Sequence, residues 1–175
     1  MINAGTDHFN MGGLMELYLI EHNSVVSLPA INLHFLSGKS AIANGDITVA
    51  TDVEAYYMQF TPETASFVEQ LKEDDHGTTF EQMLVVTVPK DRPEVTWMKF
   101  KTARGRYILI YRDNNGQTKI LGKIGKGLRL KFDLDTKNEF SGFNAHVMTA
   151  RRTSIEPAVF WNLAASEPIL DHITE

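Results

Sequence analysis

The alternation of apolar and polar residues predicts that most of this chain forms β-strands. The clearest example is Leu128 to Leu134, where leucine and phenylalanine alternate with arginine, lysine and aspartate. A period of two is typical of a strand with one buried and one exposed face. Further strands are expected at 14–20, 46–49, 55–60, 80–88, 107–111, 118–121 and 140–150. Residues 66–71 fit a strand or a single helical turn, and Pro29 makes 24–36 an edge strand or an irregular loop.

One short helix is expected between two of these strands, near residues 93–103. Asp91 is a favourable N-cap, Pro93 lies in the first turn, and Gly105 follows the last turn. The helix is expected to pack on a sheet as a lid through one face, which carries Val95, Met98 and Thr102. Beyond it, 113–116 (Asp-Asn-Asn-Gly) predicts a tight hairpin turn.

These elements predict a mainly β fold, a β-sandwich or barrel with one short helix packed on its side. The domain is expected to span 14–152, with an N-terminal arm at 1–13 and a C-terminal tail or arm at 153–175. The apolar residues at 157–163 lack a clear period, so this tail is expected to dock on its own subunit or on the next one.

Composition excludes several classes of protein and site. The chain of 175 residues has no cysteine, which excludes disulfides, thiolate nucleophiles and cysteine-based metal sites. No apolar run approaches the roughly 20 residues that a membrane helix needs. The first residues do not have the pattern of a secretory signal, so we expect a protein made and kept in a cytosol.

Charge is distributed unevenly along the chain. Residues 1–90 carry 12 acidic and 3 basic residues, whereas 91–175 carry 10 acidic and 14 basic residues. The halves can complement each other within the fold or between neighbouring copies. A basic strip is formed by Lys119, Lys123, Lys126, Arg129 and Lys131, and an acidic patch in an expected turn is formed by Glu73, Asp74 and Asp75. The strip fits a solvated face, a contact between subunits or a contact with phosphates.

Motifs for chemistry are weak. Residues 122–127 (Gly-Lys-Ile-Gly-Lys-Gly) do not have the spacing of a phosphate-binding loop and precede a strand, so they predict a turn. The turn at 113–116 does not have the alternating ligands of a calcium loop. No serine lies in a G-x-S-x-G motif. The six histidines are scattered and form no metal-binding motif: His8, His22, His34, His76, His146 and His172. We therefore expect no catalytic residue, no cofactor and no metal.

Three segments resemble small virion proteins of tailed bacteriophages and prophages, most closely tail-tube proteins of the Bacteroidetes type. They are 12–14 (Gly-Gly-Leu), 89–95 (Pro-Lys-Asp-Arg-Pro-Glu-Val) and 105–122, which starts with Gly-Arg. The resemblance implies a β-sandwich or barrel with a helix on its side, assembled into stacked and typically hexameric rings through which DNA passes. It implies sheet edges that pair between subunits, with 38–52 as one candidate stacking loop.

The same resemblance implies partners and a location. The partners would be further copies of the chain, other phage tail or neck proteins, and DNA in transient non-specific contact within the lumen, but no membrane. The location would be the virion, assembled in the cytoplasm of a bacterial host.

Two alternatives stay open. A head–tail connector, neck or tail-terminator ring protein would share the fold and form rings without tubes. A β-sandwich module that binds ligands or carbohydrate could use Tyr56, Tyr57 and Trp97 as stacking surfaces. Exposure of these aromatic residues would favour the binding module, and burial would exclude it.

Overall fold

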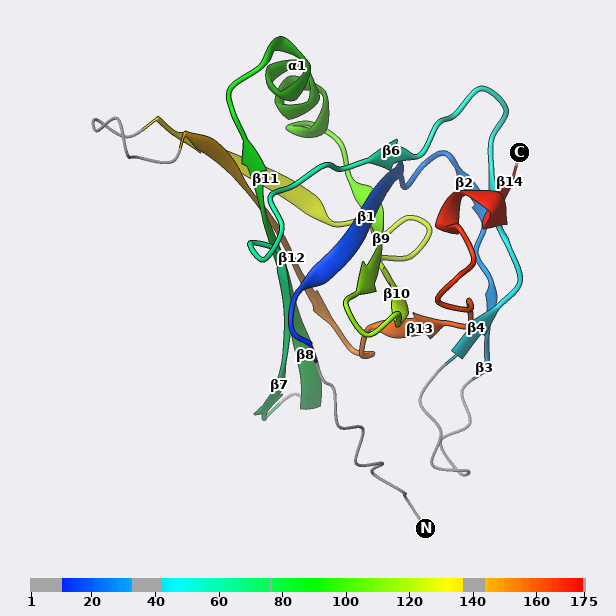
Figure 1. The fold of residues 1–175 in the computed structure, drawn as a ribbon. Helices are drawn as coiled ribbons and strands as arrows, with labels where there is room; N and C mark the ends of the chain where they lie inside the picture. Colours follow the sequence, from blue (N-terminus) through cyan, green and yellow to red (C-terminus); the bar gives the residue numbers. More distant parts are fainter. Residues whose placement is uncertain (1–10, 33–41, 76, 137–143, 175) are drawn as a thin grey trace.

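A computed structural model describes residues 11–32, 42–75, 77–136 and 144–174 of the chain. The first ten residues of the predicted arm, the start of the strand expected at 140–150 and the start of the 38–52 loop lie outside the described residues. The described part forms three β-sheets and one α-helix (Figure 1). The mainly β, sandwich-like fold predicted from the sequence is confirmed, and the described strands do not close into a barrel.

A seven-stranded sheet lies at the centre of the fold. Its strand order is β3 (Ala30–Asn32), β4 (Ile42–Asn44), β13 (Val159–Trp161), β10 (Thr118–Leu121), β9 (Tyr107–Asp113), β1 (Leu14–Glu21) and β6 (Tyr56–Tyr57). Successive side chains of β1 and β9 point to opposite faces, and both faces are buried: Leu17 and Leu109 join one apolar cluster, Tyr18 and Ile110 the other. Burial on both faces explains why these strands are continuous apolar runs.

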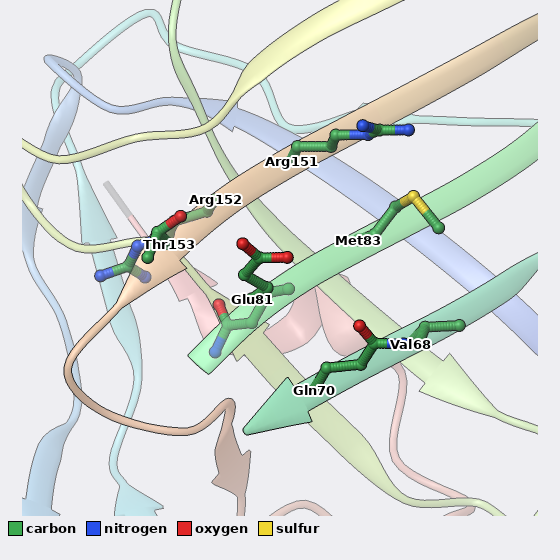
Figure 2. Close-up of a pocket in the computed structure, with 8 residues that line it drawn as sticks. Val68, Gln70, Glu81, Met83, Arg151, Arg152 and Thr153 are labelled. Atoms are coloured by element: carbon green, nitrogen blue, oxygen red, sulfur yellow. The ribbon is translucent and has the colours of Figure 1, made fainter. Parts of the chain in front are cut away.

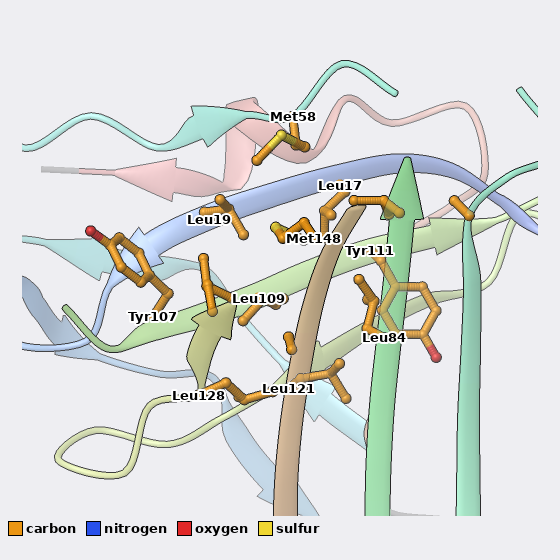
Figure 3. Close-up of a cluster of buried hydrophobic side chains, with 14 of the residues drawn as sticks. Leu17, Leu19, Met58, Leu84, Tyr107, Leu109, Tyr111, Leu121, Leu128 and Met148 are labelled. Carbon is orange, nitrogen blue, oxygen red and sulfur yellow. The ribbon is translucent and has the colours of Figure 1, made fainter. Parts of the chain in front are cut away.

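A four-stranded antiparallel sheet covers one face of the central sheet. Its order is β11 (Arg129–Asp135), β12 (Ala145–Ser154), β8 (Gly77–Pro89) and β7 (Ser66–Asp74). The predicted alternation is confirmed, because Leu84, Val86 and Val88 of β8 are buried while the residues between them are more exposed. Figure 3 shows Leu84 and Met148 of this sheet packed among side chains of the central sheet. Because β7 spans Ser66–Asp74, segment 66–71 is a strand and not a helical turn.

The C-terminal segment 153–175, predicted as a tail or arm, docks on its own subunit. Strand β13 lies inside the central sheet, antiparallel to β10 and parallel to β4. Trp161 is buried and donates a hydrogen bond from Nε1 to the Gly45 carbonyl at 3.0 Å. The 3-10 helix η2 (Ile169–His172) and β14 (Ile173–Thr174) follow, and β14 joins β5 (Ile47–Val49) and β2 (Val25–Ser27) in a three-stranded sheet. These elements help to bury the second face of the central sheet.

Arg112 holds the C-terminal segment in place. Its buried guanidinium donates to the Glu167 carbonyl at 2.6 Å, to the Ala165 carbonyl at 3.3 Å and to Thr118 Oγ1 at 3.2 Å. The Glu16 carboxylate lies 3.7 Å away and supplies the opposite charge. A buried charge is tolerated only when it is paired and hydrogen-bonded, so this site is a structural clamp.

Helix α1 (Pro93–Thr102) is found where the sequence predicted it, with Val95 and Thr102 buried and Met98 packed on the core. The prediction that Asp91 is its N-cap is wrong. The N-cap is Arg92, whose side chain makes no capping hydrogen bond. Asp91 Oδ1 instead accepts from Thr96 Oγ1 at 3.1 Å and lies 3.0 Å from Nε2 of the buried His146.

Gly105 follows the last turn as predicted, but it lies two residues beyond the C-cap Ala103 and has no positive φ. Space is the reason for glycine here, because a Cβ would come within 2.8 Å of the Tyr107 ring.

The turns agree with the sequence in outline. In the 113–116 hairpin, Gly116 adopts a φ of 78° and Asp113 Oδ1 accepts from the N–H groups of Asn115 and Gln117. Segment 122–127 is a turn closed by a bridge between Lys123 and Lys126. The acidic turn is shorter than predicted, because Glu73 and Asp74 belong to β7, where they pair with Thr78 and Gly77.

Candidate assembly surface

Histidine–carboxylate contacts in the structure connect elements of the fold. His146 and Asp91 join β12 to the start of α1, and His172 Nδ1 lies 2.7 Å from Asp46 Oδ1, which joins η2 to the segment before β5. Within the described ranges, no group of three or more histidine or acidic side chains could hold a metal ion. The helices described here include none long and apolar enough to cross a membrane. The surface of the four-stranded sheet is the more informative region.

Both edges of the four-stranded sheet are open. In the described part of the chain, β7 and β11 each pair with one strand only, β8 and β12 respectively. Helix α1 lies next to β11, and its Val95 joins the same core cluster as Phe132 of that strand, but the helix supplies no further strand to this edge. An open edge presents unpaired N–H and C=O groups that can pair with a strand from another chain.

The start of β11 and the end of β7 carry opposite charge. Arg129 and Lys131 are exposed at the start of β11, where Lys131 pairs with the exposed Asp133, whereas Glu73 and Asp75 are exposed at the end of β7 and in the turn that follows it. The sequence identified both groups but could not place them relative to each other. The structure places them on opposite edges of one sheet, where they can meet only between copies.

The other residues of the predicted basic strip lie elsewhere. Lys119 is on β10 of the central sheet, with Nζ 4.3 Å from the ring centroid of Phe160. Lys123 forms an ion pair with Glu156, and Lys126 is exposed in the turn before β11. The five residues therefore form no continuous strip, and the part relevant to the sheet edge is Arg129 and Lys131.

The outer face of the four-stranded sheet is exposed and partly basic. Arg129 lies directly opposite Arg151 on β12, and the row continues through Met83 on β8 to Val68 on β7. Figure 2 shows Arg151, Met83 and Val68 on neighbouring strands around a shallow hollow of about 380 Å³. Like charges directly opposite each other destabilise an isolated sheet, so this pair favours an anionic neighbour. The sequence missed Arg151 because the predicted strand ended at Ala150.

Helix α1 carries a second exposed surface. Trp97 and Phe100 are 55% and 69% exposed, on the side away from the core. Lys101 Nζ lies 5.0 Å from the Trp97 ring centroid and 4.6 Å from that of Tyr56, and it also contacts the Tyr56 hydroxyl. Tyr57 is exposed as well, but its ring packs against Tyr18, with the centroids 5.2 Å apart.

These contacts bear on the predicted carbohydrate-binding alternative. Exposure of Trp97 and Tyr57 supports it, but a sugar needs an open ring face for stacking. The rings of Tyr56 and Trp97 already face the Lys101 ammonium. A helix surface with aromatic and basic side chains together is better suited to an acidic protein surface.

Comparison of the chain with protein-family models, with curated proteins and with solved structures finds no match.

Proposed function

We propose that the protein is a structural virion subunit that forms the stacked rings of a phage tail tube. The observation that supports this most strongly is the four-stranded sheet, whose edge strands pair with no further strand in the described part of the chain and carry opposite charge at the end of β7 and the start of β11. The resemblance of the sequence to tail-tube proteins is consistent with the same arrangement and supplies the expected number of six copies. No step of this function requires a catalytic residue or a cofactor.

Strand direction favours pairing between β7 and β11. The four strands alternate in direction, so β7 and β11 run antiparallel to each other. Copies related by rotation about an axis along the strands therefore place β7 of one copy antiparallel to β11 of the next. Such a contact is heterologous, because each copy uses a different edge on each side, and it closes into a ring if the rotation is suitable.

The layers of the fold determine which face lines the ring. The central sheet and the three-stranded sheet both lie behind the buried face of the four-stranded sheet. They need more space than the four-stranded sheet, and a ring offers more space at its periphery than at its lumen. The exposed face of the four-stranded sheet, which carries Arg129 and Arg151, would then line the lumen. Basic side chains there fit transient, non-specific contact with DNA phosphates. The proposed location is the virion, after assembly in the host cytoplasm.

A connector, neck or tail-terminator protein is the alternative with the same edge contact. Such a protein would close rings that do not polymerise into tubes. Size-exclusion chromatography with light scattering measures ring formation, and negative-stain electron microscopy separates single rings from tubes.

The experiment compares the wild type with Arg129→Glu/Lys131→Glu at the β11 edge. We expect the wild type to form rings and the double variant to remain monomeric, since its edge repels the acidic β7 edge. Lys126→Glu is the matched control: it reverses an exposed charge in the preceding turn and should leave rings intact. A wild type that stays monomeric at high concentration, or a double variant that assembles normally, would contradict the proposal.

A further inference from the structure

We propose that the outward face of helix α1 binds an acidic amphipathic helix of another protein. The partner helix packs apolar side chains on Trp97 and Phe100 and places carboxylates beside Lys101 and Arg104. The inference goes beyond the proposed ring, because these four residues belong to neither the β7 nor the β11 edge. The region 38–52, expected from the resemblance as a stacking loop, forms β4 and β5 in its described part. Both strands pair on both sides within the domain, so they offer no open edge.

Helix α1 has apolar side chains on two opposite faces. Val95 and Met98 lie on the face that packs on the core. Trp97, Phe100 and Lys101 follow each other at i, i+3 and i+4 on the opposite, exposed face. This is the spacing through which a helix contacts another helix or a groove. A helix that packs only on its own domain has a polar outer face, so the exposed rings of α1 indicate a partner.

Each exposed ring on this face already contacts a cation. Lys101 Nζ lies 5.0 Å from the ring centroid of Trp97 and also contacts the Tyr56 hydroxyl. The guanidinium carbon of Arg104, just after the helix, lies 5.7 Å from the ring centroid of Phe100. Because these contacts hold both cations in place, less side-chain entropy is lost when a carboxylate binds them. An apolar stripe with fixed cations fits an apolar stripe flanked by carboxylates.

The charge around the helix also favours an acidic partner. Residues 90–106 carry six basic and two acidic residues. One acidic residue, Asp91, is already engaged by Thr96 and His146. The other, Glu94, lies in the first turn, away from the cations at the end of the helix. Opposite charges at the rim of a contact accelerate association and select the partner.

A second copy of this chain does not provide the acidic helix from its described residues. In that part of the chain α1 is the only α-helix, and it is basic. A groove of about 780 Å³ beside β1 and β6 could receive a helix, but Lys90 and Arg92 at its rim outnumber the carboxylate of Glu63. These cations would repel those of α1. The partner is therefore a different protein.

Nucleic acid is the other anionic partner that aromatic rings and cations attract. Its bases would need open ring faces for stacking, and Lys101 and Arg104 already lie over the rings of Trp97 and Phe100. Aliphatic side chains need no open ring face, so they can contact the ring edges while the cations stay in place. The arrangement therefore favours a protein helix.

The position of the helix suits a contact at one end of an assembly. Figure 1 shows α1 beyond one end of β8. Its 10 residues span only about 15 Å, so a single contact is small and weak. The proposed ring would present α1 of every copy at the same rim, where several linked partner helices would gain avidity.

Two synthetic helical peptides of about 18 residues, or five turns, test the contact. Both carry a leucine stripe at i, i+3, i+4 and i+7, which is flanked by glutamate in the acidic peptide and by lysine in the basic peptide. Fluorescence anisotropy of the labelled peptides measures binding. We expect the acidic peptide to bind the wild type about tenfold more tightly than the basic peptide, or better. Equal binding of the two, or no binding of the acidic peptide at roughly millimolar protein, would overturn the inference.

Variants locate the binding site. Trp97→Ala/Phe100→Ala and Lys101→Glu/Arg104→Glu should each bind the acidic peptide about tenfold more weakly, and the second should gain affinity for the basic peptide. Circular dichroism checks that both are folded. The matched controls change exposed side chains elsewhere and should bind as the wild type does: Ile155→Ala and Lys126→Glu. Unchanged binding in the two double variants would overturn the inference.

A labelled single-stranded oligonucleotide of about 12 thymidines tests the competing partner. Binding tighter than that of the acidic peptide, and lost in Trp97→Ala/Phe100→Ala, would identify a nucleic-acid site and overturn the inference. Loss of rings in the same variant would place α1 in the contact between subunits and would also overturn it.

The peptide assay separates this inference from the proposed ring. Arg129→Glu/Lys131→Glu, which is expected to be monomeric, should bind the acidic peptide as tightly as a single wild-type subunit does. Peptide binding by a wild type that forms no rings would contradict the ring proposal alone. Rings that form normally without peptide binding would overturn the inference and leave the ring proposal standing.

Discussion

The central seven-stranded sheet and the four-stranded sheet use the same secondary structure for different purposes. The central sheet buries both faces, and its edge strands β3 and β6 have three and two residues. The four-stranded sheet buries one face and exposes the other, and its edge strands β7 and β11 have nine and seven residues. We infer that the central sheet supplies most of the stability, whereas the four-stranded sheet supplies the surface for assembly.

The two tryptophans give the largest expected difference between these regions. Trp161 is buried in the central sheet, so Trp161→Ala should lower the free energy of unfolding by about 3–5 kcal/mol through lost burial and a cavity. Trp97 is exposed on α1, so Trp97→Ala should change it by less than about 1 kcal/mol. Urea denaturation followed by circular dichroism measures both. Similar losses in the two variants would remove the distinction between the regions.

Arg112 tests whether the C-terminal segment is part of the central fold. Arg112→Ala should lower the free energy of unfolding by roughly 2–4 kcal/mol, because two carbonyls, the Thr118 hydroxyl and the half-buried Glu16 carboxylate lose a charged partner. Limited proteolysis should then cut within 155–175 sooner than in the wild type. Arg106→Ala, at an exposed arginine, is the control. A loss below about 1 kcal/mol would mean that the segment is held by other contacts.

Asp91 tests how helix α1 is attached to the four-stranded sheet. Hydrogen bonds from His146 and then from Thr96 lower the pKa of the Asp91 carboxyl below its ordinary value. The ionised carboxylate therefore stabilises the fold above its ordinary pKa near 4, and this contribution is lost as pH falls through the lowered value. Asp91→Asn should be less stable at neutral pH and should show a flatter decline below about pH 4. Thermal unfolding from pH 2 to 7 measures this, and parallel curves for the two proteins would contradict it.

Lys131 should show the smallest effect on folding. Its only ion pair among the described residues is with the exposed Asp133 at 2.7 Å, and exposed pairs contribute little. Lys131→Glu should change the free energy of unfolding by no more than about 0.5 kcal/mol while it weakens ring formation. A large loss of stability would show that the β11 edge is required for folding, and it would weaken the contrast between the two sheets.

The sequence predicted local structure better than the relations between distant segments. Alternation in β8, the helix after Pro93 and the turn at Gly116 depend on neighbouring residues, and each is found in the structure. The alternation predicted for 128–134 is found as far as Phe132, whereas Leu134 is exposed. Strand β13 was missed because its three residues show no period, and its partners in β10 and β4 lie far away in sequence.

The same limit affected the candidate site. Asp91 was assigned to a cap because its actual partner, His146, lies 55 residues further along the chain. The charged residues could be read from the sequence, but their position on opposite edges depends on the strand order β11-β12-β8-β7. Strand order is set by long-range packing, which local patterns do not specify.

An engineered disulfide between β7 and β11 tests the central proposal most directly. The natural chain has no cysteine, so a chain with Gln70→Cys and Lys131→Cys contains only the introduced pair. Three strand spacings separate β7 from β11, about 14 Å, whereas a disulfide needs Cα atoms within roughly 7 Å. Any disulfide must therefore join different copies. Lys72 and Asp133 lie on the same outer face as Gln70 and Lys131. Pairing a cysteine at 70 or 72 with one at 131 or 133 gives four combinations, which test different registers between β7 and β11.

Oxidised protein is separated on a non-reducing denaturing gel. We expect a ladder of cross-linked species that ends at the closed ring, and a sharp decrease when Lys126→Cys replaces the cysteine on β11. The last step of the ladder would give the number of copies. If all four edge combinations stay monomeric at concentrations where the protein is otherwise well folded, β7 and β11 do not meet, and the proposed ring is wrong.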